Sequence, residues 1–212
     1  MENLAQEIAR SLLQINAIKL SPQKPFTWAS GIQSPIYCDN RIALSYPAVR
    51  NQIVHGFAQL AQSMDFDAVA GVATAGIPWG ALLADRLSLP FLYVRSKPKE
   101  HGRQNRIEGM LEEGQKILVT EDLISTGGSS LQAVDALREQ GAEVISILAI
   151  FSYQFDEARQ AFKDQNCNHQ TLSNYTALLS VANELNYINA ADLTALQKWS
   201  TNPRAWQISD EV

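Results

Sequence analysis

Apolar residues recur with a helical period in two stretches near the start of the chain, 2–15 and 46–63. Within each stretch the apolar side chains return every three or four residues, which places them on one face of an α-helix. Ser45 and Pro47 are residues that favour a helix start, and they stand at the beginning of the second stretch. The apolar positions are Leu4, Ile8 and Leu12 in the first stretch and Val49, Ile53, Phe57 and Leu60 in the second. We therefore predict two amphipathic helices.

Between these helices, residues 17–41 show no sustained period. Proline, glycine and serine interrupt short runs such as Phe26-Thr27-Trp28 and Pro35-Ile36-Tyr37-Cys38. Glycine and proline favour turns, whereas aromatic and β-branched residues favour strands. We expect short strands and turns in this segment.

From residue 68 onward, short apolar runs alternate with helical periods. This alternation requires crossover connections, so we expect the strands to lie mostly parallel in one sheet with helices on its faces. The predicted strands are 68–73, 90–94, 116–120 and 143–151, the predicted helices are 77–87 and 128–140, and a polar loop covers 95–108. Ligands of such sheets bind beyond the carboxyl ends of the strands, so the loops there are the places to look for chemistry.

The last part of the chain, 155–199, predicts two or three helices around a short strand near 169–172. No repeat, low-complexity segment or linker divides the 212 residues. We therefore predict a single domain over 1–212, with a small N-terminal substructure formed by 17–41 and the first helix, and a helical C-terminal segment, 155–212.

Charge and cysteine content restrict the partners, the metal sites and the compartment that we expect. The formal net charge of −5 repels phosphate backbones and anionic lipids, so we predict neither a nucleic-acid nor a membrane partner. Cys38 and Cys167 lie far apart and lack the spacing of metal ligands. We find no signal peptide and no apolar stretch long enough to span a bilayer, so the expected compartment is the cytoplasm.

Residues 117–130, ILVTEDLISTGGSS, join a buried strand to a helix through two acids and two glycines. Backbone N–H groups at a helix N-terminus bind phosphate, and glycines let the backbone approach it closely. Glu121 and Asp122 would repel a polyphosphate, but they suit the hydroxyls of a ribose whose 5-phosphate lies in the loop. The stretch matches neither the nucleotide P-loop nor the dinucleotide pattern. We predict a ribose 5-phosphate site, the alternative being acids that only complement the helix dipole.

Two further loops belong to the same edge of the predicted sheet. Residues 73–78 form a strand-to-helix turn that can present N–H groups to an anion, although an ordinary turn would be the favoured interpretation of this stretch if the other loops were absent. Residues 95–109, RSKPKEHGRQNRIEG, gather positive charge in an acidic chain. A pyrophosphate leaving group needs such charges, and a loop that closes over the site would exclude water. The alternative is a solvated surface loop.

The stretch ILVTEDLISTGGSS resembles the phosphoribosyl pyrophosphate motif of the type I phosphoribosyltransferases. Two other stretches, FTWASGIQSPIYCDNR (26–41) and RSKPKEHGRQNRIEG, narrow the resemblance to the members of this family that act on orotate. The resemblance implies an α/β fold with a mostly parallel central sheet flanked by helices and a small N-terminal hood. It also implies transfer of the 5-phosphoribosyl group of phosphoribosyl pyrophosphate to orotate in pyrimidine biosynthesis, giving orotidine 5-monophosphate and pyrophosphate.

By the same resemblance, Mg²⁺ is the cofactor, held mainly by substrate oxygens and water rather than by protein metal ligands. The resemblance also implies a homodimer in which residues 95–109, called the cationic loop below, contribute to the active site of the neighbouring subunit. Catalytic roles fall to Lys99, His101 and Asp122. The residues assigned to phosphoribosyl pyrophosphate are Arg95, Lys99, His101, Glu121, Asp122, Leu123, Ile124, Ser125, Thr126, Gly127, Gly128 and Ser129.

The turn at Thr74, Ala75 and Gly76 resembles the pyrophosphate loop of the family. Pointing consecutive N–H groups at one anion is difficult with trans peptides, so we expect a strained backbone there, and the resemblance suggests a non-proline cis peptide. The residues assigned to orotate are Ser125, Tyr37 and Arg41.

The chain departs from many members of the family at two places. Ala29 stands where many have Lys, and Phe151-Ser152-Tyr153 stands where many have Arg. Arg41 is our candidate for a substitute cation at the orotate carboxylate, and the alternative is a surface Arg paired with Asp39.

Two other functions share the fold and the phosphate cradle. One is a regulator that senses phosphoribosyl pyrophosphate and contacts nucleic acid, and the other is a purine-base phosphoribosyltransferase. The acidic charge disfavours the regulator, and the hood motif at 26–41 disfavours purine substrates.

Overall fold

The structure is a computed structural model that describes residues 2–27, 31, 33–97 and 106–206. The chain divides into two compact units, Asn51–Leu172 and Met1–Arg50 with Ser173–Val212. The first is called the sheet unit below, and the second the terminal unit. None of the described helices is both long enough and apolar enough to cross a membrane.

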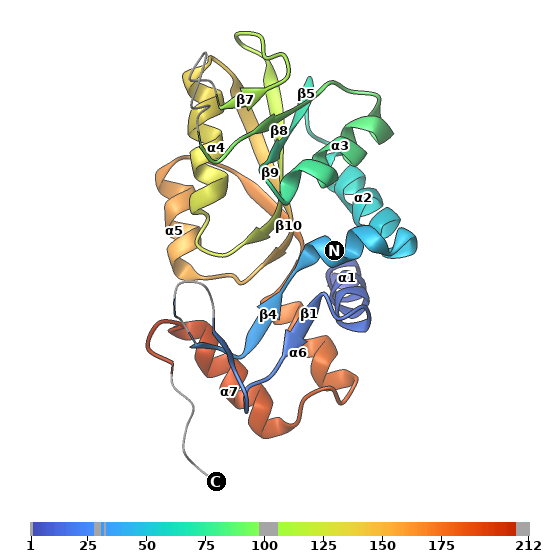
Figure 1. The fold of residues 1–212 in the computed structure, drawn as a ribbon, viewed down its shortest axis with the longest axis vertical. Helices are drawn as coiled ribbons and strands as arrows, with labels where there is room; N and C mark the ends of the chain where they lie inside the picture. The colour runs from blue at the N-terminus through green and yellow to red at the C-terminus, as the bar shows by residue number, and fades with distance from the viewer. Residues whose placement is uncertain (1, 28–30, 32, 98–105, 207–212) are drawn as a thin grey trace. The chain divides into compact units, whose positions relative to one another are not determined.

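A sheet of six strands forms the centre of the sheet unit in the described part of the chain, in the order β10-β9-β8-β5-β6-β7 (Figure 1). Neighbouring strands from β9 to β6 are parallel, and β7 is antiparallel to β6. The strands are β5 (Ala68–Val72), β6 (Phe91–Val94), β7 (Ile107–Glu108), β8 (Lys116–Ile124), β9 (Glu143–Ser152) and β10 (His169–Asn174), of which 169–172 belong to this unit. The mostly parallel sheet predicted from the sequence is confirmed.

Helices cover both faces of this sheet. Thr120 of β8 contacts α3 (Gly76–Leu87), whereas Glu121, the next residue, contacts α4 (Gly128–Glu139). Successive side chains of a strand point to opposite faces, so α3 and α4 lie on opposite faces, as Figure 1 shows. Because both faces are covered, β5 is buried along its whole length and consists of small and branched apolar residues. On the side of α4 lies α5 (Asp156–Asp164), and α2 (Pro47–Ala61) enters the unit at residue 51.

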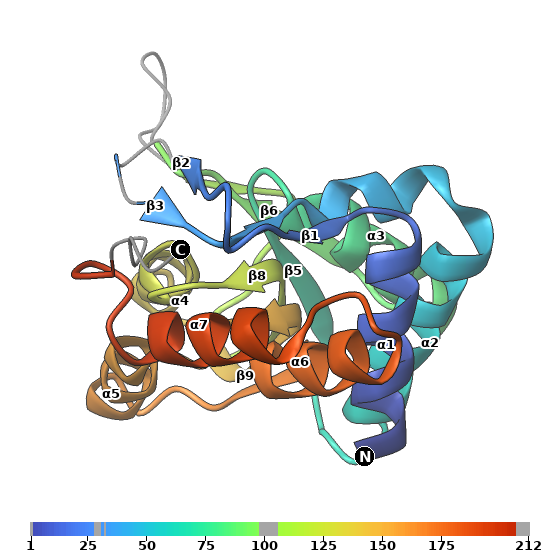
Figure 2. The same cartoon turned by 90° about the horizontal axis from the view of Figure 1, so that it is seen from below.

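The terminal unit is built from both the N-terminal and the C-terminal part of the chain. Figure 2 shows α1 (Glu2–Gln14) beside α6 (Tyr175–Glu184), and Arg10 Nη2 donates a hydrogen bond of 2.8 Å to Glu184 Oε1. Helix α7 (Ala190–Thr201) begins with a capping box between Asn189 and Asp192. The Tyr175 hydroxyl donates to Leu196 O at 3.0 Å, which ties α6 to α7. The C-terminal helices around a strand, predicted from the sequence, are therefore confirmed.

Short strands fill the rest of the terminal unit. β1 (Ile18–Leu20) pairs antiparallel with β4 (Ile36–Cys38), and β2 (Phe26–Thr27) pairs antiparallel with β3 (Gln33–Ser34). A 3-10 helix, η1 (Asn40–Ser45), follows β4 and is capped by Asp39. This agrees with the short strands and turns expected for 17–41.

Two predicted boundaries were wrong. The strand predicted to end at residue 120 continues to Ile124, because the longer β9 supplies partners as far as Ser152. The predicted polar loop 95–108 contains β7, where Ile107 pairs with Val94 and is buried. In both places a neighbouring strand, rather than local composition, determines the pairing.

Candidate functional site

The extended β8 brings two adjacent acids to the carboxyl end of the sheet. Glu121 lies opposite Ala149 of β9, and Asp122 follows it within the strand. The two differ in exposure, since Glu121 is 4% exposed and Asp122 is partly exposed. Leu123 and Ile124, also assigned to the site from the sequence, pair with Phe151 and Ser152, and Ile124 is buried. The last residues of β8 are therefore held in the sheet by β9.

The Glu121 carboxyl is held by its own surroundings. Its Oε1 accepts a hydrogen bond from the Asp122 N–H at 3.0 Å, and its Oε2 accepts from the hydroxyls of Ser129 and Ser130 at 3.3 Å each. Burial, and after it the neighbouring Asp122 carboxylate, raise the pKa of Glu121 well above its usual range. The side chain thus connects β8 to the first turn of α4.

The loop between β8 and α4 has the form of an anion cradle. Gly127 caps α4 with φ 84°, a left-handed conformation that favours glycine. The N–H groups of residues 125–129 donate no hydrogen bond to another described residue. Unpaired N–H groups at a helix N-terminus, together with the helix dipole, favour a phosphate. Ser125, Thr126, Gly127, Gly128 and Ser129 thus span the turn after β8 and the first residues of α4, and their role as phosphate ligands stays a prediction.

The turn after β5 is the second anion candidate. The peptide bond between Ala73 and Thr74 is cis, which confirms the cis peptide suggested for this turn. The N–H groups of Thr74, Ala75 and Gly76 donate no hydrogen bond to another described residue. Because Gly76 O accepts from the hydroxyl of Thr120, just before Glu121, this turn and the cradle meet on β8. The sequence did not single out Thr120. Its only signal there is that one polar residue ends an apolar run.

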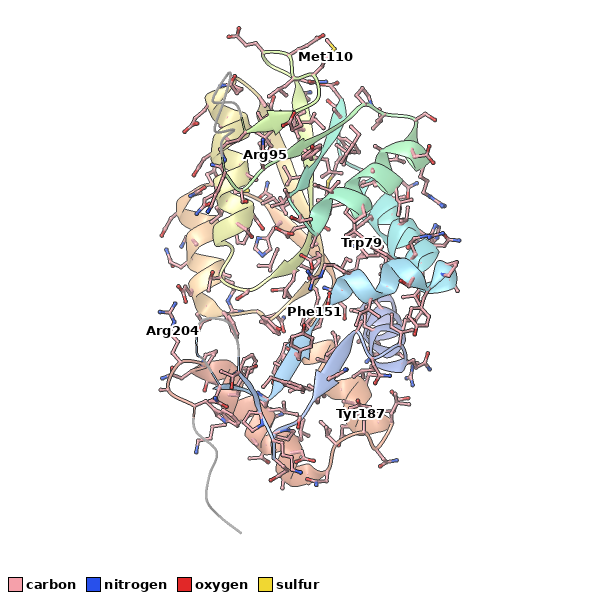
Figure 3. All side chains as sticks on the ribbon, in the orientation of Figure 1. Trp79, Arg95, Met110, Phe151, Tyr187 and Arg204 are labelled. Carbon is pink, nitrogen blue, oxygen red and sulfur yellow. The ribbon has the colours of Figure 1, made fainter. Side chains whose placement is uncertain are left out.

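The described ends of the cationic loop are paired with each other. Arg95, labelled in Figure 3, donates its N–H to Arg106 O at 2.8 Å, and Arg106 Nε donates to Arg95 O at 3.0 Å. Arg95 Nη1 also lies 3.5 Å from Glu108 Oε1. Lys97 is exposed, and the predicted residues Lys99 and His101 lie outside the described residues. These pairs place Arg95 beyond the carboxyl end of β6.

The hood residues belong to the terminal unit. Tyr37 of β4 is 40% exposed, and its ring lies 5.6 Å from that of Phe26. Arg41 Nε and Nη2 donate to the two oxygens of Asp39 at 2.7 and 2.9 Å. This hydrogen-bonded pairing, before the charge itself, lowers the pKa of Asp39. The ion pair is the alternative described for Arg41 above, and Ala29 lies outside the described residues.

The segment at the end of β9 is an aromatic cluster. Phe151, labelled in Figure 3, is fully buried, Ser152 is 6% exposed and Tyr153 is 3% exposed. The Tyr153 ring lies 5.7 Å from Phe151 and stacks on Phe155 at 5.3 Å. The position where many family members have Arg is therefore part of the apolar packing of the sheet unit.

Comparison with known proteins agrees with this geometry. The model of the phosphoribosyl transferase domain family matches residues 46–181. The orotate phosphoribosyltransferase of Lactococcus lactis subsp. cremoris (strain MG1363) is 49% identical over 97% of this chain and 99% of its own. Among solved structures, the orotate phosphoribosyltransferase of Aeropyrum pernix is 26% identical with a TM-score of 0.74, covering 86% of this chain and 99% of its own. The UMP synthase of Leishmania donovani is 27% identical with a TM-score of 0.77, covering 92% of this chain and 42% of its own.

Proposed function

Because this chain belongs to the orotate phosphoribosyltransferase family, we propose that it transfers the 5-phosphoribosyl group of phosphoribosyl pyrophosphate to orotate. The bond from ribose C1 to pyrophosphate oxygen breaks, a bond from C1 to the orotate ring nitrogen forms, and the proton of that nitrogen is lost to solvent. The products are orotidine 5-monophosphate and pyrophosphate, in the de novo synthesis of UMP. The observation that carries this proposal is the anion cradle at residues 125–129, directly after an acidic pair.

Each part of the cradle has a role in this reaction. The N–H groups of residues 125–129 hold the ribose 5-phosphate, because they donate to no backbone group among the described residues. Asp122 accepts hydrogen bonds from the ribose hydroxyls and stabilises the positive charge that grows on the ribose as the leaving group departs. Glu121, held by Ser129 and Ser130, keeps the cradle fixed relative to β8.

The pyrophosphate needs donors and positive charge at the other end of the substrate. The N–H groups of Thr74, Ala75 and Gly76 supply donors, and Arg95 supplies a cation beyond β6. From the resemblance alone, Lys99 and His101 add positive charge as the departing oxygens gain negative charge. For the base, Tyr37, Arg41 and Ser125 are the candidates, again from the resemblance alone.

The donor atoms of the site fit a magnesium ion that takes most of its ligands from substrate and water. In the part of the chain that the structure describes, no three His, Cys, Asp or Glu side chains gather as a metal cage. The Glu121 oxygens already accept hydrogen bonds from protein groups. Mg²⁺ commonly keeps several waters and binds substrate phosphates. When bound, it would neutralise the pyrophosphate oxygens and orient the ribose.

We further propose that the protein acts in the cytoplasm as one phosphoribosyltransferase domain that assembles into a homodimer, and that its substrates are small molecules. Identity of 49% with the Lactococcus enzyme over nearly the whole chain supports the same substrates. The two alternatives, a regulator and a purine-base transferase, are not favoured by these relatives.

The test is an assay with single bases. The protein is mixed with phosphoribosyl pyrophosphate, Mg²⁺ and one base at a time, and orotate absorbance is followed. We expect orotate to be consumed and pyrophosphate to form in equal amounts, while uracil, adenine and hypoxanthine remain. Consumption of a purine instead would support the second alternative. Binding of phosphoribosyl pyrophosphate with no base consumed would support the regulator.

A further inference from the structure

Thr120 places a buried hydroxyl between the two anion-binding loops of the sheet unit. Its side chain is fully buried in β8, and Oγ1 lies 3.2 Å from Gly76 O and 3.4 Å from Ala70 O. A hydroxyl has one proton, so the shorter contact, to Gly76, is the better hydrogen bond. Gly76 ends the turn that begins at the cis peptide, and Thr120 directly precedes Glu121.

The first turn of α3 lies unusually close to β8 at this point. A Cβ on Gly80 would come within 2.5 Å of Thr120 Oγ1, and a Cβ on Gly76 would collide with the Thr120 carbonyl oxygen. Two glycines four residues apart therefore allow direct contact between helix backbone and strand. The Thr120 hydroxyl adds a hydrogen bond that ties this turn of the helix to one residue of β8.

We propose that Thr120 is a positioning residue that fixes the distance between the pyrophosphate turn at 74–76 and the ribose 5-phosphate cradle at 125–129. This inference rests on the proposed function. Phosphoribosyl pyrophosphate carries charged groups at both ends of its ribose, so its binding requires both sets of N–H groups at the right separation. Ribose 5-phosphate lacks the pyrophosphate, so its binding requires the cradle alone.

The test compares the dissociation constants of these two ligands, measured by calorimetry with Mg²⁺ present. The informative pair is Thr120→Ser and Thr120→Ala, which differ from each other only in the hydroxyl. We expect Thr120→Ala to weaken phosphoribosyl pyrophosphate about five- to tenfold, the range for one buried hydrogen bond, and to leave ribose 5-phosphate within about twofold. Thr120→Ser should bind both ligands as the unchanged protein does. Thr120→Val, which keeps the volume without the hydroxyl, should match Thr120→Ala.

A matched control separates positioning from general stability. Ser146 of β9 is 3% exposed and donates to Asn168 O at 3.3 Å, so Ser146→Ala also removes a hydroxyl-to-carbonyl bond, a partly buried one, in the same unit. It should lower stability without changing the ratio of the two dissociation constants. Equal weakening of both ligands by Thr120→Ala, or no weakening of either, would overturn the inference, as would a Thr120→Ser variant as weak as Thr120→Ala.

The outcome is independent of the base assay. If the expected ligand ratio is found but orotate is not consumed, the positioning role stands and the proposed function fails. If orotate is consumed while all Thr120 variants bind phosphoribosyl pyrophosphate normally, the proposed function stands and the positioning role fails.

Discussion

Glu121 and Asp122 are adjacent in the chain, but they differ in burial and in hydrogen bonding, and we therefore expect them to have different roles. Glu121 is 4% exposed and accepts three hydrogen bonds from protein groups, so its carboxyl is already committed to the cradle. Asp122 is partly exposed, so a ribose hydroxyl can reach its side chain more readily than that of Glu121. At the scale of single residues, Asp122 is therefore the better candidate for direct contact with the reacting ribose.

Asp122→Asn should lower kcat more than it weakens substrate binding. The amide keeps the shape of the side chain but loses the negative charge that opposes the positive ribose in the transition state. We expect a loss on the order of 100-fold in kcat with a change in KM of a few-fold at most. Steady-state kinetics measure both, with Asp135→Asn, an exposed carboxylate on α4, as the control. A change confined to KM would contradict this role for Asp122.

Gly127→Ala should impair the cradle and the stability together. Its left-handed φ of 84° disfavours a side chain, and a Cβ there would come within 2.8 Å of the Phe162 ring. Gly114→Ala is the matched control, because Gly114 has φ 78° and open space around its Cβ position. Both variants should lose about 1 kcal/mol of unfolding free energy from the backbone conformation.

Only Gly127→Ala should lose more than that amount and also bind ribose 5-phosphate weakly. Denaturant unfolding and ligand titration give the two quantities. If the two variants behaved alike in both measurements, the contact between the cradle and α5 would have no importance for the site.

At the scale of elements, the junction of α5 and β10 links the cradle to the opposite end of the sheet. Phe162 of α5 faces Gly127 on one side, and its ring stacks on His169 of β10 at 4.1 Å. His169 also lines a cavity of about 520 Å³, whose other lining groups include Asp65, Lys116 and Glu143. Burial lowers the pKa of His169.

This lowered pKa predicts that the protein loses stability as the pH falls through the pKa of an unfolded histidine, about 6.5. Below that pH the unfolded chain binds a proton at His169 that the folded chain resists, so protonation favours unfolding. His169→Gln should remove this contribution. The unfolding free energy of both proteins is measured between about pH 7.5 and 5, and only the difference between them is used, because carboxylates titrate in both. Two parallel curves would rule out a contribution from His169.

At the scale of the whole molecule, the proposed homodimer makes a testable statement about the cationic loop. If the loop serves the neighbouring subunit, Lys99→Ala and Asp122→Asn remove different halves of one shared site. Each homodimer should then be nearly inactive. Unfolding and refolding the two variants together makes about half of the dimers mixed, and each mixed dimer has one intact site.

Activity of the refolded mixture should therefore rise to roughly a quarter of that of the unchanged protein, provided that the two sites act independently. Each variant refolded alone is the control for recovery of folded protein. A mixture as inactive as its parents, with mixed dimers demonstrated by mass spectrometry, would mean that the loop acts within its own chain.

The sequence by itself determined what depends on neighbours along the chain. Short apolar runs and the helical period placed β5, α3, α4 and β9 within about one residue, because these signals are local. The phosphate cradle was predicted for the same reason, since glycines at a helix start are the requirement for such a loop. The order of alternating strands and helices also determined a mostly parallel sheet, because crossover connections leave little choice.

Only the tertiary structure decided what depends on partners far away in the chain. β8 runs to Ile124 because β9 pairs with it, and Ile107 forms a strand because β6 lies beside it. Glu121 is buried because α4 covers it, and Thr120 reaches Gly76 across 44 positions. Burial and hydrogen bonding at such separations depend on which surfaces meet when the chain folds. They cannot be predicted from the neighbouring residues in the sequence.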